Sequence, residues 1–164
     1  MAGETTMSVQ DVLESLRDGQ VRLMGVLRQI DESAADVPVG GQGRSAKDWV
    51  AILIHHAGDV AGGLGADLSP PPYVVGVGGR LDIDEWHRRA AEYWRPVAFG
   101  DQVDELDRIV DKLAAAVRTR TDQDMNATDR IPWAGERPLW AIVGGVTFRR
   151  AWPECIAALG EAQK

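Results

Sequence analysis

The chain has 164 residues, a formal net charge of −7 and a pI of about 4.9. Hydrophobic residues make up 45% and charged residues 26% of it, which is typical of one soluble globular domain spanning residues 1–164. An acidic chain is repelled on average by a phosphate backbone, so nucleic acid is not an expected partner. The single cysteine, Cys155, excludes an internal disulfide. No apolar run has the length of a membrane span, and the first residues lack the pattern of a signal peptide, so we expect a cytoplasmic protein.

The first predicted helix covers about residues 8–30. Its apolar positions alternate spacings of four and three, as in a bundle, and are Val9, Leu13, Leu16, Leu23, Leu27 and Ile30. Gln20 falls on the same face and is its one polar member. A glycine-rich connector over residues 36–43 follows.

The second predicted helix covers about residues 46–61 and begins with a capping box formed by Ser45 and Asp48. Its apolar face includes His56, because that residue follows Leu53 by three positions and precedes Val60 by four. We therefore expect His56 to point toward the core. A polar group there must form hydrogen bonds, or its desolvation costs about 1–3 kcal/mol. His55 projects about 100° away and is expected at the surface or under the following loop.

The rest of the chain predicts three more helices and no strand. A long loop rich in proline and glycine covers residues 62–80, and a short helix follows at about 83–94. Asp101 is expected to cap a helix that ends near residue 120, and residues 121–130 are a connector. The last helix runs from about 137 to 159 and is expected to kink at Pro153. The predicted fold is all-α: a four-helix bundle with an extra short helix and one long loop.

Three segments resemble the DinB-like four-helix bundle superfamily. They are the capped stretch at 44–56, the short helix at 84–93 and the stretch at 138–150. The similarity is greatest to the branch that contains the colibactin self-resistance protein, a cyclopropane hydrolase. That branch reads approximately W-S-x-K-D-x-L-x-H-L-x-x-W in its second helix. The resemblance implies the bundle fold, a ligand site between the helices, and pairing of two copies through helix faces.

Metal-binding members of the superfamily use three histidines, and this chain departs from that pattern. The alignment places Ile52, Arg150 and Glu154 at the three ligand positions. Isoleucine has no donor atom, and arginine carries a permanent positive charge that repels a metal ion. A slip of one helical turn offers His55 or His56 instead, which still leaves fewer than three ligands. We therefore predict no bound metal and no cofactor.

Four polar residues on otherwise apolar helix faces are the candidate site. His56 would act as a base or hydrogen-bond donor, Glu154 would orient it or activate a water, and Arg150 would hold an anionic group. Gln20 would line the same pocket. The alternative is purely structural: an internal ion pair between Arg150 and Glu154, a hydrogen-bonded core histidine and a hydrogen-bonded glutamine.

Aromatic side chains extend the candidate site. Trp49, Trp86, Trp133 and Trp152 could form a wall for a flat or apolar ligand, although a tryptophan at such a position more often fills the core. His87, on the short helix, is either at the lip of the pocket or solvated.

The predicted function is therefore binding of a reactive small molecule, with its hydrolysis or sequestration as in the self-resistance branch. One alternative is a metal- and thiol-dependent transferase or isomerase of the same superfamily. Another is a homodimer-forming module without enzymatic activity.

Overall fold

The computed structural model describes residues 5–41, 43–68, 83–131, 135–144, 157 and 159. Within these residues there are seven helices, and the only strand-like pairing is a single bridge between Val39 and Arg44. The helices are α1 (Val9–Leu27), α2 (Glu32–Ala35), α3 (Ala46–Gly63), α4 (Ile83–Trp94), α5 (Phe99–Arg118), α6 (Asp122–Asn126) and α7 (Leu139–Ala141). The predicted all-α fold is confirmed.

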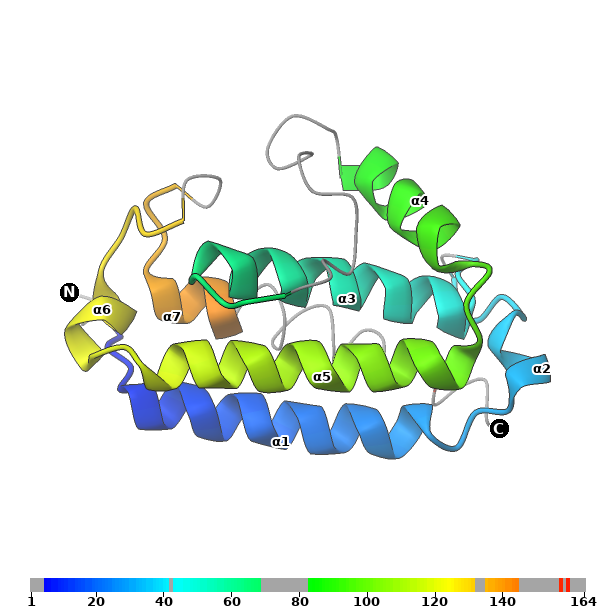
Figure 1. Cartoon of the computed structure of the whole chain (residues 1–164), viewed down its shortest axis with the longest axis horizontal. Coiled ribbons are helices and arrows are strands. Elements are labelled where there is room, and N and C mark those ends of the chain that lie inside the picture. Colours follow the sequence, from blue (N-terminus) through cyan, green and yellow to red (C-terminus); the bar gives the residue numbers. More distant parts are fainter. Residues whose placement is uncertain are drawn as a thin grey trace.

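Three long helices form the body of the bundle (Figure 1). α5 contacts both α1 and α3, so it lies between them. α3 and α5 run in the same direction and α1 runs in the opposite one. α4 packs on α3 and crosses it at an angle. None of the helices that the structure describes combines the length and the apolar composition needed to cross a bilayer.

α3 is the central helix, because it is buried on nearly all sides. Twelve of its 18 residues are buried, including Leu53 and Ile54, which are fully inaccessible. A helix that is apolar all round packs against neighbours on every face rather than along one stripe. His55 was predicted at the surface or under the loop, and it is only 4% exposed, so the surface position is wrong. That alternative assumed a single buried face, whereas both α4 and α5 pack against this helix.

The predicted capping box at the start of α3 is confirmed. Ser45 Oγ accepts a hydrogen bond from Asp48 N at 3.2 Å, and Asp48 Oδ2 accepts one from Ser45 N at 3.0 Å. Ser8 and Asp11 form the equivalent capping box at the start of α1. α4 has the predicted bounds. Each capping box satisfies backbone donors that the first helical turn leaves without partners.

The start of α5 differs from the prediction, because Asp101 lies in the first turn and does not cap it. The helix begins at Phe99, whose N–H donates to Glu32 Oε2 on α2 at 2.8 Å. Lys47 Nζ on α3 lies 3.1 Å from the other oxygen of Glu32. The hydrogen bond from Lys47, followed by that from Phe99, lowers the pKa of Glu32. The sequence analysis assigned no helix to residues 32–35, so it missed this remote cap.

A second short helix, α6, lies within the predicted connector 121–130. Its Asp122 Oδ1 accepts a hydrogen bond from Val9 N at 2.7 Å, at the first turn of α1. Asn126 accepts a hydrogen bond from Met7 N and donates one to Met7 O, at 3.0 and 2.9 Å. α6 therefore holds the start of α1 by hydrogen bonds from far along the chain.

The predicted last helix is seen only in part. α7 begins at Leu139 with Pro138 as its N-cap, and residues 157 and 159 are helical. The predicted kink at Pro153, and residues 69–82 of the predicted loop, lie outside the described residues.

Replacing a central side chain of α3 tests its place in the core. We expect Leu53→Ala to lower the free energy of unfolding by about 2–5 kcal/mol, because it leaves a cavity in a fully buried position. Val21→Ala is the matched control: Val21 is 62% exposed, so its change should stay within about 0.5 kcal/mol. Urea unfolding followed by circular dichroism measures both. Equal values for the two variants would contradict the central position of α3.

Candidate functional site

The three histidines of the chain gather at the contact between α3 and α4. His55 and His56 lie on α3 and His87 on α4, around the indole ring of Trp86. The ring centroids of His56 and Trp86 are 4.4 Å apart in an edge-to-face arrangement. Those of His55 and Trp86 are 6.0 Å apart, and His87 stacks on Trp86 at 5.9 Å. We call these four residues and Arg44 the histidine cluster.

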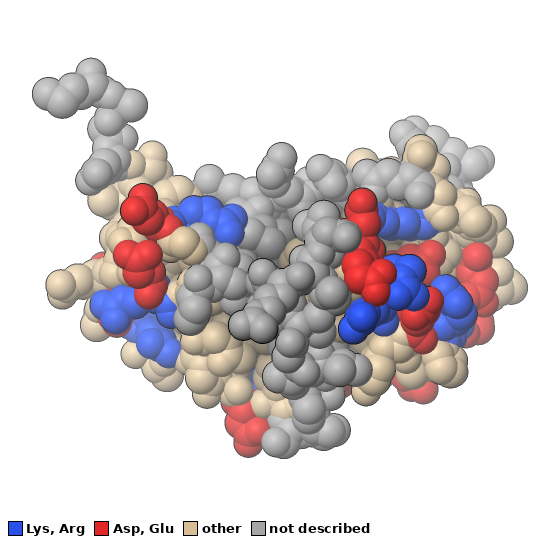
Figure 2. All heavy atoms as spheres, turned by 90° about the horizontal axis from the view of Figure 1, so that it is seen from above, with Lys and Arg blue, Asp and Glu red and all other residues tan. Residues whose placement is uncertain are grey.

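Amphipathic packing of α4 against α3 places Trp86 and His87 in the cluster. Trp86, Ala90 and Trp94 are spaced four residues apart and form one stripe, of which the last two are buried. The opposite face carries charges of both signs, which Figure 2 shows gathered over this helix. Its ion pairs link Arg88 to Glu85 and Glu92, and Arg89 to Glu85. Exposed pairs of this kind contribute only about 0.3–0.5 kcal/mol each, so the buried stripe determines how α4 docks.

Hydrogen bonds connect the cluster into a chain. An Nη2 of Arg44 lies 3.1 Å from His87 Nδ1, and His87 Nε2 lies 3.2 Å from His56 Nε2. A guanidinium only donates, so His87 Nδ1 must be the acceptor. A neutral His87 then carries its proton on Nε2 and donates it to His56 Nε2. His56 in turn carries its own proton on Nδ1.

Burial keeps these imidazoles neutral, as that assignment requires. Desolvation, followed by the positive charge that His87 would carry, lowers the pKa of His55 to about 4. The same two causes, with smaller effects from His55 and Arg44, lower the pKa of His56 to about 3. Burial and then the charge of Arg44 lower the pKa of His87. At neutral pH the cluster therefore holds one fixed charge, on Arg44.

Arg44 is held from two sides. Its backbone oxygen accepts a hydrogen bond from Val39 N at 2.8 Å, in the one β-bridge among the described residues. Its guanidinium carbon lies 5.1 Å from the centre of the Trp49 ring, in a cation–π contact. The indole of Trp49 is buried, and its Nε1–H has no acceptor among the residues that the structure describes. An aromatic face and an unused donor thus lie next to the guanidinium.

The structure brings together four of the residues that the sequence singled out. His56, His87 and Trp86 are in direct contact, and Trp49 joins them through Arg44. His87 is half-buried and hydrogen-bonded at both ring nitrogens, rather than solvated.

Gln20 lies elsewhere, between α1 and α5. Its Nε2 donates to Asp107 and Asp111 on α5 at 2.8 and 3.0 Å, whereas the histidine cluster lies between α3 and α4. The position on the α1 seam was correct, but the neighbour across that seam is the acidic edge of α5. Arg150, Glu154, Trp133 and Trp152 lie outside the described residues, so their place in the site stays a prediction.

Sequence reasoning missed Arg44 and His55. Arg44 directly precedes the N-cap of α3, where a positive charge is unfavourable against the helix dipole. An arginine at this unfavourable position indicates that its side chain has a specific partner elsewhere in the fold, and this was the signal available in the sequence. For His55 the signal was the run of apolar residues on every face of 46–61, which indicates a helix buried all round.

Among the described residues, no three histidine, cysteine or carboxylate side chains are grouped to hold a metal ion.

The arrangement of helices matches that of solved structures over nearly the whole chain. The crystal structure of the colibactin self-resistance protein ClbS in complex with double-stranded DNA has a TM-score of 0.69 at 15% identity, covering 96% of each chain. A Streptococcus pneumoniae protein has a TM-score of 0.79 at 8% identity, covering 98% of this chain and 92% of that one. The sibling lethal factor precursor DfsB has a TM-score of 0.74 at 14% identity, covering 97% and 96%.

At these identities the likeness is one of fold. No protein-family model matches the chain, and no curated protein matches it.

The lowered pKa values predict how stability depends on pH. The unfolded chain binds a proton at each histidine below about pH 6.5, whereas the folded chain resists protonation of His55 and His56 until about pH 4 and 3. The contribution of these two histidines to the free energy of unfolding is therefore fully present above pH 7. It is lost as the pH drops from 6.5 toward 4. Between pH 6.5 and 5 we expect a loss of about 1–2 kcal/mol for each of these two histidines.

The variant His56→Gln isolates one titrating group. A glutamine oxygen can still accept a hydrogen bond from His87 Nε2, but it binds no proton in this range. Urea unfolding at pH 7.5, 6.5, 5.5 and 5.0 should give a shallower loss of stability than in the wild type. Parallel curves would show that His56 does not titrate with folding.

Proposed function

We propose that this protein binds a reactive small molecule at the histidine cluster and hydrolyses or sequesters it, as a self-resistance protein does. The observation that carries the proposal is the meeting of all three histidines with Arg44 between two tryptophans, on helices that otherwise pack through apolar side chains. Perturbed titratable groups gathered in this way mark a candidate functional site. The fold shared with the colibactin self-resistance protein supports the same class of function.

The chemistry of the cluster defines what the ligand must carry. The Arg44 guanidinium offers donors to a carboxylate, an enolate or a carbonyl oxygen. The ring of Trp86 and that of Trp49 offer apolar surface, and Trp49 Nε1–H offers one further donor. The ligand is therefore an electrophile with an anionic or strongly polar oxygen next to an apolar body.

Arg44 controls whether the histidines can act as a base. In the ligand-free chain both acceptor nitrogens are occupied, His87 Nδ1 by Arg44 and His56 Nε2 by His87. A ligand oxygen that draws the guanidinium away leaves the lone pair of His87 Nδ1 free. Pairing with an anion also cancels the charge of Arg44, which is the second cause of the low pKa of His87. The imidazole then becomes a stronger base when the ligand is in place.

Hydrolysis follows from that change. A water oxygen bonds to the electrophilic carbon, and the strained or activated bond at that carbon breaks. His87 Nδ1 takes the proton of the water, and the leaving atom takes the electron pair and is later protonated. Glu154 keeps its predicted role of orienting His56 or activating the water, and Arg150 that of holding an anionic group. Pairing of two copies through helix faces stays an alternative function.

The test uses epoxides and activated cyclopropanes, each with and without a carboxylate group. We expect the wild type to bind the carboxylates and Arg44→Gln to bind them at least about tenfold more weakly, because a charge-assisted hydrogen bond is lost. Arg95→Gln is the matched control, an exposed arginine at the end of α4. Calorimetry measures binding, and mass spectrometry measures the addition of one water.

His87→Gln separates the two halves of the proposal. It should retain binding and lose water addition, since a glutamine is not a base at neutral pH. Binding by the wild type without water addition would assign sequestration and reject hydrolysis. If Arg44→Gln and Arg95→Gln bound every probe as the wild type does, the histidine cluster would not be the site.

A further inference from the structure

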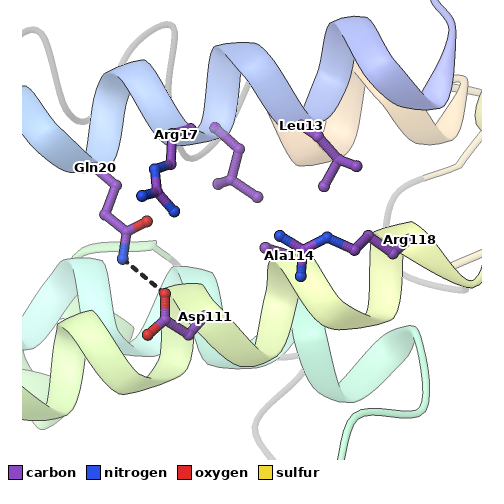
Figure 3. Close-up of a pocket in the computed structure, with 7 residues that line it drawn as sticks. Leu13, Arg17, Gln20, Asp111, Ala114 and Arg118 are labelled. Atoms are coloured by element: carbon purple, nitrogen blue, oxygen red, sulfur yellow. Dashed lines mark hydrogen bonds between the residues drawn. The ribbon is translucent and has the colours of Figure 1, made fainter.

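A recess lies between α1 and α5, away from the residues of the histidine cluster. It has a volume of about 130 Å³. Its lining comes from one face of each helix: Leu13, Leu16, Arg17 and Gln20 on α1, and Asp111, Ala114 and Arg118 on α5 (Figure 3). We call it the α1–α5 recess. Ala114, the small residue of the lining on α5, contributes only a methyl group.

The α1–α5 recess combines an apolar floor with two positive side chains. Leu16 is buried and Leu13 is half-buried, so they present hydrocarbon at the base. In Figure 3 the side chains of Arg17 and Arg118 both turn toward the space between the helices. Across the described part of the chain, neither guanidinium has a carboxylate within ion-pair distance.

The remaining polar groups of the recess already have partners. Gln20 uses its amide N–H groups on Asp107 and Asp111, at 2.8 and 3.0 Å. Asp107 Oδ2 also accepts a hydrogen bond from Arg28 Nη2 at 3.4 Å. Asp111 is the one carboxylate in the lining, beside the two arginines. The lining therefore carries a net charge of +1, which attracts an anion.

From these features we infer that the α1–α5 recess binds a small carboxylate with an apolar body. The two guanidinium groups pair with the carboxylate, in the geometry that arginine favours. The apolar body lies on Leu13, Leu16 and Ala114. A cavity of about 150 Å³ lined by apolar side chains holds benzene, so the recess suits an aromatic or short branched acid. This site is independent of the proposed hydrolysis at the histidine cluster.

Benzoate is the probe that tests the inference. At low ionic strength, where exposed charges are least screened, titration should shift the amide resonances of residues lining the recess. Benzamide has the same shape without the charge, and inorganic phosphate has charge without the apolar body. We expect both to bind at least about tenfold more weakly than benzoate.

Substitutions locate the binding. Arg17→Gln and Arg118→Gln should each weaken benzoate binding about tenfold, and Ala114→Leu should abolish it by filling the space. Arg22→Gln, on the exposed part of the same helix, is the matched control and should bind as the wild type does. His87→Gln should also leave benzoate binding unchanged, which separates this site from the histidine cluster. Equal binding of benzamide and benzoate, or an equal loss in Arg22→Gln, would overturn the inference.

Discussion

The constraint on which this structure depends is the placement of two adjacent histidines, His55 buried and His56 half-buried, in a helix that is covered on nearly every side. An imidazole in a core has to be neutral and needs a partner for its polar atoms. α4 supplies Trp86 and His87 against that face of α3. Because arginine can only donate, Arg44 then fixes the direction of the whole hydrogen-bonded chain. The docking of α4, the neutral state of the histidines and the chemistry proposed for them thus share one cause.

The parts of the fold that the sequence predicted are those with local signals. The start of α3 follows from a capping box within four residues, and the bounds of α4 follow from its periodicity and flanking turns. α2 and α6 have four and five residues, too few to show a helical period. The start of α5 was mispredicted because its first donor is satisfied by Glu32, which is 67 positions earlier. No pattern within a single helix reveals a cap that another segment provides.

The site was predicted unevenly for a related reason. Periodicity identified His56 and Gln20 as polar residues on helix faces, but it could not say which neighbour each face meets. His56 meets α4 and joins a cluster, whereas Gln20 meets the acidic edge of α5 and is saturated by two aspartates. Arg44 was missed because it precedes its helix and acts through a loop bridge. Partners across an interface depend on how helices dock, which the spacing within one helix does not determine.

The two remote caps also impose an order on how the protein is completed during synthesis. Glu32 leaves the ribosome before Phe99, so α5 meets an existing acceptor as it forms. For α1 the order is reversed, because Val9 N donates to Asp122 Oδ1, which is synthesised 113 residues later. Chains are made from the N-terminus at about 5–20 residues per second, so the first turn of α1 stays without this partner for several seconds. The N-terminal end of α1 can therefore be completed only after α6 has been synthesised, so this is a late step in the folding of the bundle.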